Sequence, residues 1–232
     1  MWRYIFSLWF SAAILSSSGQ QPGQDREKQP PENTESGDQA ALPKADWTPH
    51  DLKVGFNAIR SGRTVFGSDI LTHEIQSALA MHQLNVILDL GIEENTYGEG
   101  YRYENKGRYF RFGADWNFVN DKESGNAISL GLRYARAGFD DRLEYSSDLG
   151  FGTTDISLEN SKLNARWLEV TFNLRGKVVD NLYMGFTMRW QFMRKVNGEG
   201  QLATFNVPGF GNTKRQNSTA FDYYFMWRLP FG

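Results

Sequence analysis

The sequence predicts an all-β protein, an eight-stranded antiparallel up-and-down transmembrane β-barrel. Aromatic residues are frequent, with 17 Phe, 10 Tyr and 7 Trp, yet the mean hydropathy is −0.53. From residue 50 onward apolar and polar residues alternate, which is typical of strands with one apolar face. After the N-terminus no run of 18 apolar residues would predict a membrane-spanning helix. Together these observations favour strands over helices.

The N-terminal residues are expected to lie outside the fold. Residues 1–19 are typical of a secretory signal peptide, because Arg3 is followed by an apolar run at 4–15 and then by small residues. Residues 20–46 contain four prolines and no aromatic residue. They cannot bury enough apolar area to offset the entropy of ordering. We therefore expect a disordered periplasmic tether, followed by the barrel at 47–232.

Charges balance within the predicted barrel. The chain carries −2 in all, with +1 in residues 1–19 and −3 in residues 20–46, so residues 47–232 have no net charge. This balance gives no reason to expect nucleic acid as a partner. The chain has no cysteine, which excludes disulfides, thiolate metal sites and a thiol nucleophile.

Three segments show the clearest strand pattern. Residues 109–118 place Phe110, Phe112, Ala114, Trp116 and Phe118 on one face, and residues 182–193 and 220–231 repeat this alternation. Weaker alternation predicts five more strands, at 52–58, 75–81, 84–92, 128–134 and 168–174. A helix over 75–92 is the alternative for that segment, because it contains few helix breakers.

The predicted connections alternate between long and short. Long ones are expected between the first two strands and at 95–107, 138–163 and 196–216. Outer-membrane barrels have long loops at one end and tight turns at the other. The face with the largest rings is therefore expected to contact outer-membrane lipid, and the face with glycines and charges to line the lumen. A soluble barrel, the alternative, would have an apolar lumen.

Equal numbers of acidic and basic residues lie on the face predicted to line the lumen. They are Lys53, Glu74, Asp89, Glu93, Arg111, Asp115, Arg133, Glu169, Arg175, Arg189, Asp222 and Arg228. Buried charges persist only when they are paired, and eight strands leave interior space only for side chains. We predict a structural ion-pair network that plugs the lumen. A narrow proton or ion path is the alternative.

No convincing catalytic set is present, so we predict a non-enzymatic protein with no cofactor and no metal site. Ser68, Asp69 and His73 could form a Ser/His/acid set at the barrel rim, as in enzymes that modify lipid A. No strand motif fixes a serine beside the histidine, however. A rim enzyme therefore stays an alternative hypothesis.

An apolar turn in the last long loop is a candidate contact with a partner. Phe205, Val207, Pro208 and Phe210 lie on a loop that would otherwise face water. Contact with another envelope protein or with lipid headgroups would explain these residues. Packing over the barrel mouth would explain them equally well.

Several segments have a familiar form. They are KGRYFRFGADWNF (106–118), SLGLRYARAGF (129–139), LNARWLEVTFNLRGKV (163–178), NLYMGFTMRW (181–190), NVPGFG (206–211) and FDYYFMWRLPF (221–231). These segments resemble a family of small Bacteroidetes outer-membrane barrels known as a domain of unknown function. The resemblance implies a signal peptide, a β-barrel and an outer-membrane location, and it supplies no catalytic residues. It also points to an accessory role beside the outer-membrane protein assembly machinery.

Overall fold

The computed structural model describes residues 47–65, 70–119, 124–148, 150 and 152–229. The predicted signal peptide (1–19) and tether (20–46) lie outside these residues. Ser68 and Asp69 of the hypothetical rim site also lie outside them.

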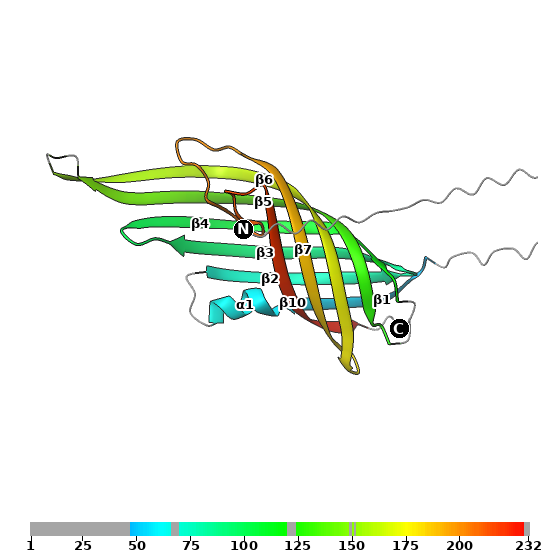
Figure 1. The fold of residues 1–232 in the computed structure, drawn as a ribbon. Coiled ribbons are helices and arrows are strands. Elements are labelled where there is room, and N and C mark those ends of the chain that lie inside the picture. Colours follow the sequence, from blue (N-terminus) through cyan, green and yellow to red (C-terminus); the bar gives the residue numbers. More distant parts are fainter. Residues whose placement is uncertain (1–46, 66–69, 120–123, 149, 151, 230–232) are drawn as a thin grey trace, which may run out of the picture. The chain divides into compact units, whose positions relative to one another are not determined.

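Eight long antiparallel strands form a closed ring in the described part of the chain. They are β1 (Pro49–Asn57), β2 (Ile70–Met81), β3 (Leu84–Tyr97), β4 (Tyr101–Asn117), β5 (Ala127–Asp148), β6 (Thr153–Val179), β7 (Leu182–Asn197) and β10 (Asn217–Leu229). Their order around the ring is β1-β10-β7-β6-β5-β4-β3-β2 (Figure 1). This up-and-down barrel confirms the predicted fold class, and residues 75–92 form two strands rather than a helix.

The ring has two different ends. At the turn end, two-residue connections join β2 to β3 and β6 to β7, and residues 118–126 join β4 to β5. At the loop end lie the other connections along the chain. The barrel closes where β1 pairs with β10, from Leu52 opposite Leu229 to Asn57 opposite Tyr224.

Alternation along the strands separates an apolar outer face from a polar inner face. The outer side chains Phe112, Leu132 and Phe221 are 55%, 61% and 51% exposed, respectively. On the inner face Arg111 and Arg189 are fully buried. The large rings therefore point away from the lumen, as the strand pattern predicted.

The connection between β1 and β2 contains a helix that the sequence pattern did not predict, α1 (Ala58–Val65). Asn57 caps its first turn, because the Arg60 backbone N–H donates to Asn57 Oδ1 at 3.1 Å. Capping of this kind satisfies a helix-terminal donor. Among the described residues, no helix combines the length and the apolar character needed to cross a bilayer.

Two of the predicted long loops are extensions of strands. Residues 95–107 belong mostly to β3 and β4, and residues 138–163 continue β5 and β6, which pair as far as Asp148 and Thr153. Figure 1 shows the β5–β6 hairpin reaching well past its neighbours at the loop end. Many side chains of this hairpin are exposed and polar, so the apolar alternation that marks the wall strands is lost there.

Candidate functional site

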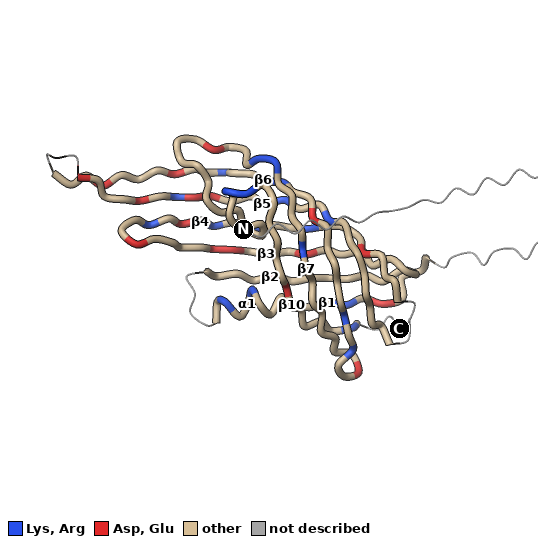
Figure 2. Tube along the Cα trace, viewed as in Figure 1, with Lys and Arg blue, Asp and Glu red and all other residues tan. Residues whose placement is uncertain are grey.

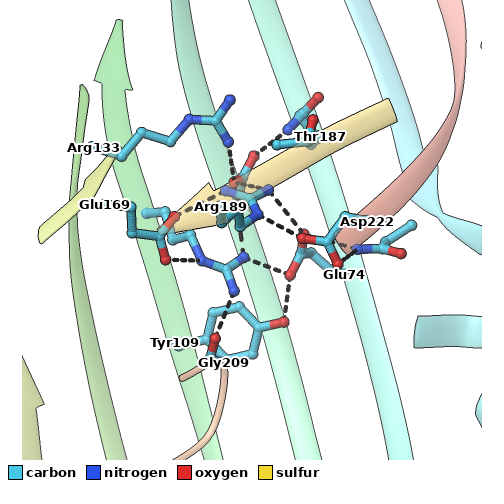
Figure 3. A network of polar contacts seen from close by, with 12 residues as sticks. Glu74, Tyr109, Arg133, Glu169, Thr187, Arg189, Gly209 and Asp222 are labelled. Atoms are coloured by element: carbon cyan, nitrogen blue, oxygen red, sulfur yellow. Dashed lines mark hydrogen bonds and ion pairs between the residues drawn. The ribbon is translucent and has the colours of Figure 1, made fainter. Parts of the chain in front are cut away.

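Arginines and carboxylates share the centre of the lumen (Figure 3). Arg111 Nη1 donates to Glu74 Oε2 at 2.6 Å, and Arg111 Nε donates to Glu169 Oε1 at 2.9 Å. Arg189 Nη1 donates to Glu169 Oε2 at 2.9 Å, and Arg189 Nε donates to Asp222 Oδ2 at 2.5 Å. Each of these arginines therefore bridges two acids, Arg111 those of β2 and β6 and Arg189 those of β6 and β10.

Arg133 continues the network toward the turn end. Its Nη1 donates to Asp89 Oδ2 at 2.9 Å and its Nη2 donates to Asp115 Oδ2 at 3.0 Å. Arg189 Nη2 lies 3.3 Å from the same Asp89 oxygen, which joins this group to the centre. Every one of these side chains is at most 5% exposed. Charge-assisted hydrogen bonds on several sides offset the cost of removing such ions from water.

Neutral side chains complete the network. The hydroxyls of Tyr109 and Tyr224 both donate to Glu74, the first at 2.5 Å. Asn57 Nδ2 donates to Asp222 Oδ1 at 2.7 Å. These groups share the lumen-facing strand positions with the charges, so alternation could have identified them.

Two charged members of the lumen network were not predicted from the sequence. Arg60 of α1 donates from Nε to Asp222 Oδ1 at 3.0 Å and lies 3.6 Å from Glu93. Asp51 pairs with Lys53 and lies 3.5 Å from Arg228. Arg60 could not be assigned without α1, whereas Asp51 lies on the same strand face as Lys53. One is basic and one is acidic, so the balance of the network is preserved.

Three predicted members lie apart from the central group. Lys53 and Arg228 contact Asp51 near the turn end. Arg175 Nη1 is 4.0 Å from Met226 Sδ, and Arg175 forms no ion pair with the described acids. The network is therefore one central group with a smaller cluster beside it.

Residues 198–216, here called the plug loop, enter the loop end of the lumen. They carry the short strands β8 (Asn206–Val207) and β9 (Gly211–Asn212). At the tip, the Gly209 carbonyl accepts from Arg111 Nη2 at 2.9 Å and the Gly209 N–H donates to Glu93 Oε2 at 3.0 Å. The plug loop is thus hydrogen-bonded to the charge network itself.

Glycine is required at the tip of the plug loop. Gly209 has a φ of 81°, a backbone conformation that residues with a Cβ rarely adopt. A Cβ at this position would lie 2.7 Å from the ring of Tyr109. The close approach brings the backbone of the plug loop against the tyrosine that hydrogen-bonds Glu74.

The candidate partner-contact residues are mostly buried by this arrangement. Val207 and Phe210 are 0% and 4% exposed, and Pro208 is also buried. Phe210 packs edge-on against Trp167, with ring centroids 5.8 Å apart. The partner-contact interpretation is therefore wrong for these three residues, because they pack inside the barrel mouth. Phe205 remains 38% exposed.

The plug loop is anchored to the extended part of β4 and β5. Tyr103 Oη accepts from the Phe205 and Asn206 backbone N–H groups at 3.2 and 3.4 Å. Asn105 Nδ2 donates to the Asn206 carbonyl at 3.0 Å. The Tyr103 hydroxyl donates to Asp141 Oδ2 at 3.1 Å, and burial raises the pKa of both the Asp141 carboxyl and the Tyr103 hydroxyl.

The turn end of the lumen is closed by apolar and aromatic side chains. They are Ala78, Ile87, Tyr183, Tyr224 and Met226. A cavity of about 20 Å³ beside Asp115 and Tyr224 leaves space for about one water molecule. The plug loop, the charge network and this cluster therefore occupy successive levels of the described barrel, and a pocket of about 670 Å³ lies between α1 and the plug loop at the loop end.

Of the hypothetical rim site, only His73 lies within the described residues. His73 lies exposed on the outer face of β2, and its two proposed partners are outside the described residues. Within the described ranges, no group of three or more His, Cys, Asp or Glu side chains could hold a metal ion.

Comparison with known proteins gives a family but no activity. The family model described as domain of unknown function (DUF6048) matches residues 1–232. No curated protein matches the chain. A crystal structure of neisserial surface protein A is similar to the chain with 15% sequence identity and a TM-score of 0.36, covering 78% of this chain and 94% of that one.

Proposed function

Because the chain belongs to the DUF6048 family of domains of unknown function, we propose a function from its geometry. The protein is a non-enzymatic integral outer-membrane β-barrel with a plugged lumen, and it acts as a structural or interaction protein. Its partner is another envelope protein, with the outer-membrane protein assembly complex as the first candidate.

The observation that carries the membrane assignment is the apolar belt around the barrel. Large apolar side chains are exposed on the outward face of neighbouring strands, for example Ile75, Leu90, Phe112, Leu132 and Leu168, each more than half exposed. Soluble monomers rarely expose contiguous apolar patches of this extent. Lipid removes this surface from water, and a closed ring leaves no strand edge unpaired in hydrocarbon.

The filled lumen supports a role other than transport. A pore needs a continuous water path, whereas Arg111 and Glu93 here hold the plug loop across the lumen. Opening such a path would separate the Gly209 backbone from both charges. Each separation leaves a buried polar group without a partner, which costs about 1–3 kcal/mol.

An interaction role is supported by the long β5–β6 hairpin. Residues 153–163 of β6 extend past Asn164, where pairing with β7 stops. The plug loop hydrogen-bonds the Asn160 side chain, and the edge of the hairpin from residue 153 to residue 159 has no β7 neighbour. A strand edge of this kind can pair with another chain. The resemblance to a family of small outer-membrane barrels, for which an accessory role beside the assembly machinery is expected, favours the same kind of role.

The membrane assignment is tested by folding the protein into vesicles. Outer-membrane barrels that have inserted stay folded in detergent at low temperature and unfold on boiling. The folded and the boiled protein therefore migrate differently in gel electrophoresis, and we expect this difference for the full chain. In planar bilayers we expect no steady current. A chain that floats free of vesicles would overturn the membrane assignment, and a steady current would overturn the plugged lumen.

The interaction role is tested by affinity purification from mildly solubilised membranes. The wild-type protein should recover a partner in fixed ratio. A variant with residues 143–158 replaced by a short Gly-Asn turn should insert normally and lose it, whereas the surface variant Arg102→Gln should retain it. Recovery of the wild-type barrel alone would count against this role.

A further inference from the structure

Four outward-facing arginines lie on neighbouring strands, each on the loop side of the apolar-belt residues of its own strand. Arg108, Arg136, Arg166 and Arg194 come from β4, β5, β6 and β7 in turn, and all four are exposed. We call them the basic girdle. Figure 2 shows basic residues recurring along these neighbouring strands.

The girdle arginines are close neighbours across the strands. Arg136 lies directly opposite Arg166 in the β5–β6 register. Arg108 lies opposite Gly138, two residues from Arg136 on the same face. Arg194 adjoins Arg166 at the irregular step of the β6–β7 register. Like charges in such positions repel each other, so the girdle is destabilising unless an anion lies over it.

Among the described residues, no acidic side chain pairs with the girdle. Farther out on the same face, Arg102 pairs with Glu104, Lys106 with Glu94 and Arg142 with Glu144, each at 2.5 Å. The four girdle arginines form no ion pair with any acid in the described part of the chain. Beside Arg136, the Asn164 amide oxygen can accept from Arg136 Nε at 2.9 Å, which orients the guanidinium without neutralising it.

A groove on the outer face connects the girdle with the apolar belt. Its volume is about 630 Å³, and it runs over β2, β3, β4 and β5. It is lined by Ile75, Leu90 and Phe110 on the apolar side and by His73, Arg108 and Arg136 on the basic side. The space over Gly138 on the basic side is open, because a Cβ built there would meet nothing within 4 Å.

We propose that the basic girdle and this groove bind a phosphorylated lipid of the outer leaflet, of the lipid A type. Acyl chains lie along Leu90 and Phe110, and phosphates lie over Arg108, Arg136 and Arg166. Guanidinium groups bind phosphate through paired N–H donors, and basic side chains at the edge of an apolar belt recognise anionic headgroups. The proposal rests on the outer-membrane function above, because long loops face the cell surface in such barrels.

The test uses the detergent-solubilised full chain titrated with diphosphoryl lipid A and with the same lipid after removal of its phosphates. Bound lipid is counted by native mass spectrometry. The wild-type protein should prefer the phosphorylated lipid. The double variant Arg136→Gln/Arg166→Gln should bind it about 30-fold more weakly, at about 1 kcal/mol for each arginine, and it should bind the dephosphorylated lipid as before.

Matched variants separate the girdle from general charge. Arg102→Gln/Lys106→Gln also removes two outward basic groups from the same side of the barrel, but each of them is paired with an acid. This control should retain wild-type affinity, and Arg136→Lys/Arg166→Lys should retain most of it. If the Gln variant does not fold, the Lys variant and the salt dependence of wild-type binding test the proposal instead. In 0.5 M salt, phosphate-dependent binding to the wild-type protein should be several-fold weaker.

Several outcomes would overturn the inference. They are equal binding of the two lipids, an equal loss in the Arg102/Lys106 control, or displacement of the lipid by inorganic phosphate at the same concentration. A chain that inserts into vesicles but ignores the phosphates would refute the lipid site alone. A chain that does not insert would refute the proposed function as well.

Discussion

Replacing Arg189 by methionine tests whether the central charges are held by mutual pairing. Arg189 is fully buried and contacts Asp222 at 2.5 Å, Glu169 at 2.9 Å and Asp89 at 3.3 Å. Methionine keeps much of the side-chain volume and removes the charge. The carboxylates would then share Arg60, Arg111 and Arg133 only.

The expected loss of stability is large. Removing one partner of a buried ion pair costs about 3–5 kcal/mol, because the remaining charge stays buried without compensation. The control Arg102→Met breaks the exposed pair with Glu104, whose side chains are 63% and 40% exposed. Exposed pairs contribute about 0–1 kcal/mol. The two substitutions therefore differ in cost by several-fold although each removes one arginine.

The assay is urea unfolding of the vesicle-inserted protein, followed by tryptophan fluorescence. Adding Asp222→Asn to Arg189→Met should recover part of the lost stability, because it removes one negative charge and restores the balance between acidic and basic side chains in the network. The reasoning would be refuted if Arg189→Met cost no more than Arg102→Met. It would also be refuted if Asp222→Asn made the variant still less stable.

Three further predictions concern the plug loop and the apolar belt. Gly209→Ala should cost at least about 1–2 kcal/mol from its backbone conformation, with the clash against Tyr109 added, and limited proteolysis should then cut residues 198–216 faster. Leu132→Arg places a charge in the middle of the belt and should cost about 2–4 kcal/mol, seen as a lower inserted fraction in vesicles. Because burial raises the pKa of Asp141, folding favours its protonated form, and the stability from this site falls as pH rises through that raised pKa. The melting temperature of Asp141→Asn relative to wild type should therefore increase with pH.

The barrel wall could be predicted from the sequence because its signal is local. A strand in the wall contacts lipid on one side and the lumen on the other, so alternation is kept at each pair such as Phe112 and Arg111. The loop-side extensions contact water on many of their side chains, and polar residues such as Asp140 and Arg142 hide the strand period there. Strand ends at Asp148 and Thr153 were therefore missed.

The sequence predicts which residues face the lumen, but it does not predict which of them pair with each other. Lumen-facing positions follow from strand parity, and this identified Arg111, Glu74 and Glu169. Their partners depend on where each strand lies around the ring, since Arg111 and Glu169 are 58 residues apart in sequence. Arg60 enters from a short helix, and Gly209 from a loop that doubles back. Neither has a periodic signal.

The seam between β1 and β10 makes closure of the ring and completion of the ion-pair network a single event. Asp222 and Tyr224 both come from β10, and they contact Arg60, Arg189 and Glu74 from other parts of the chain. An open sheet that had entered hydrocarbon before β10 arrived would expose guanidinium groups short of an acid and two bare strand edges. Assembly in the bilayer is thus expected to proceed without a stable half-closed intermediate, unless a helper protein shields that open side.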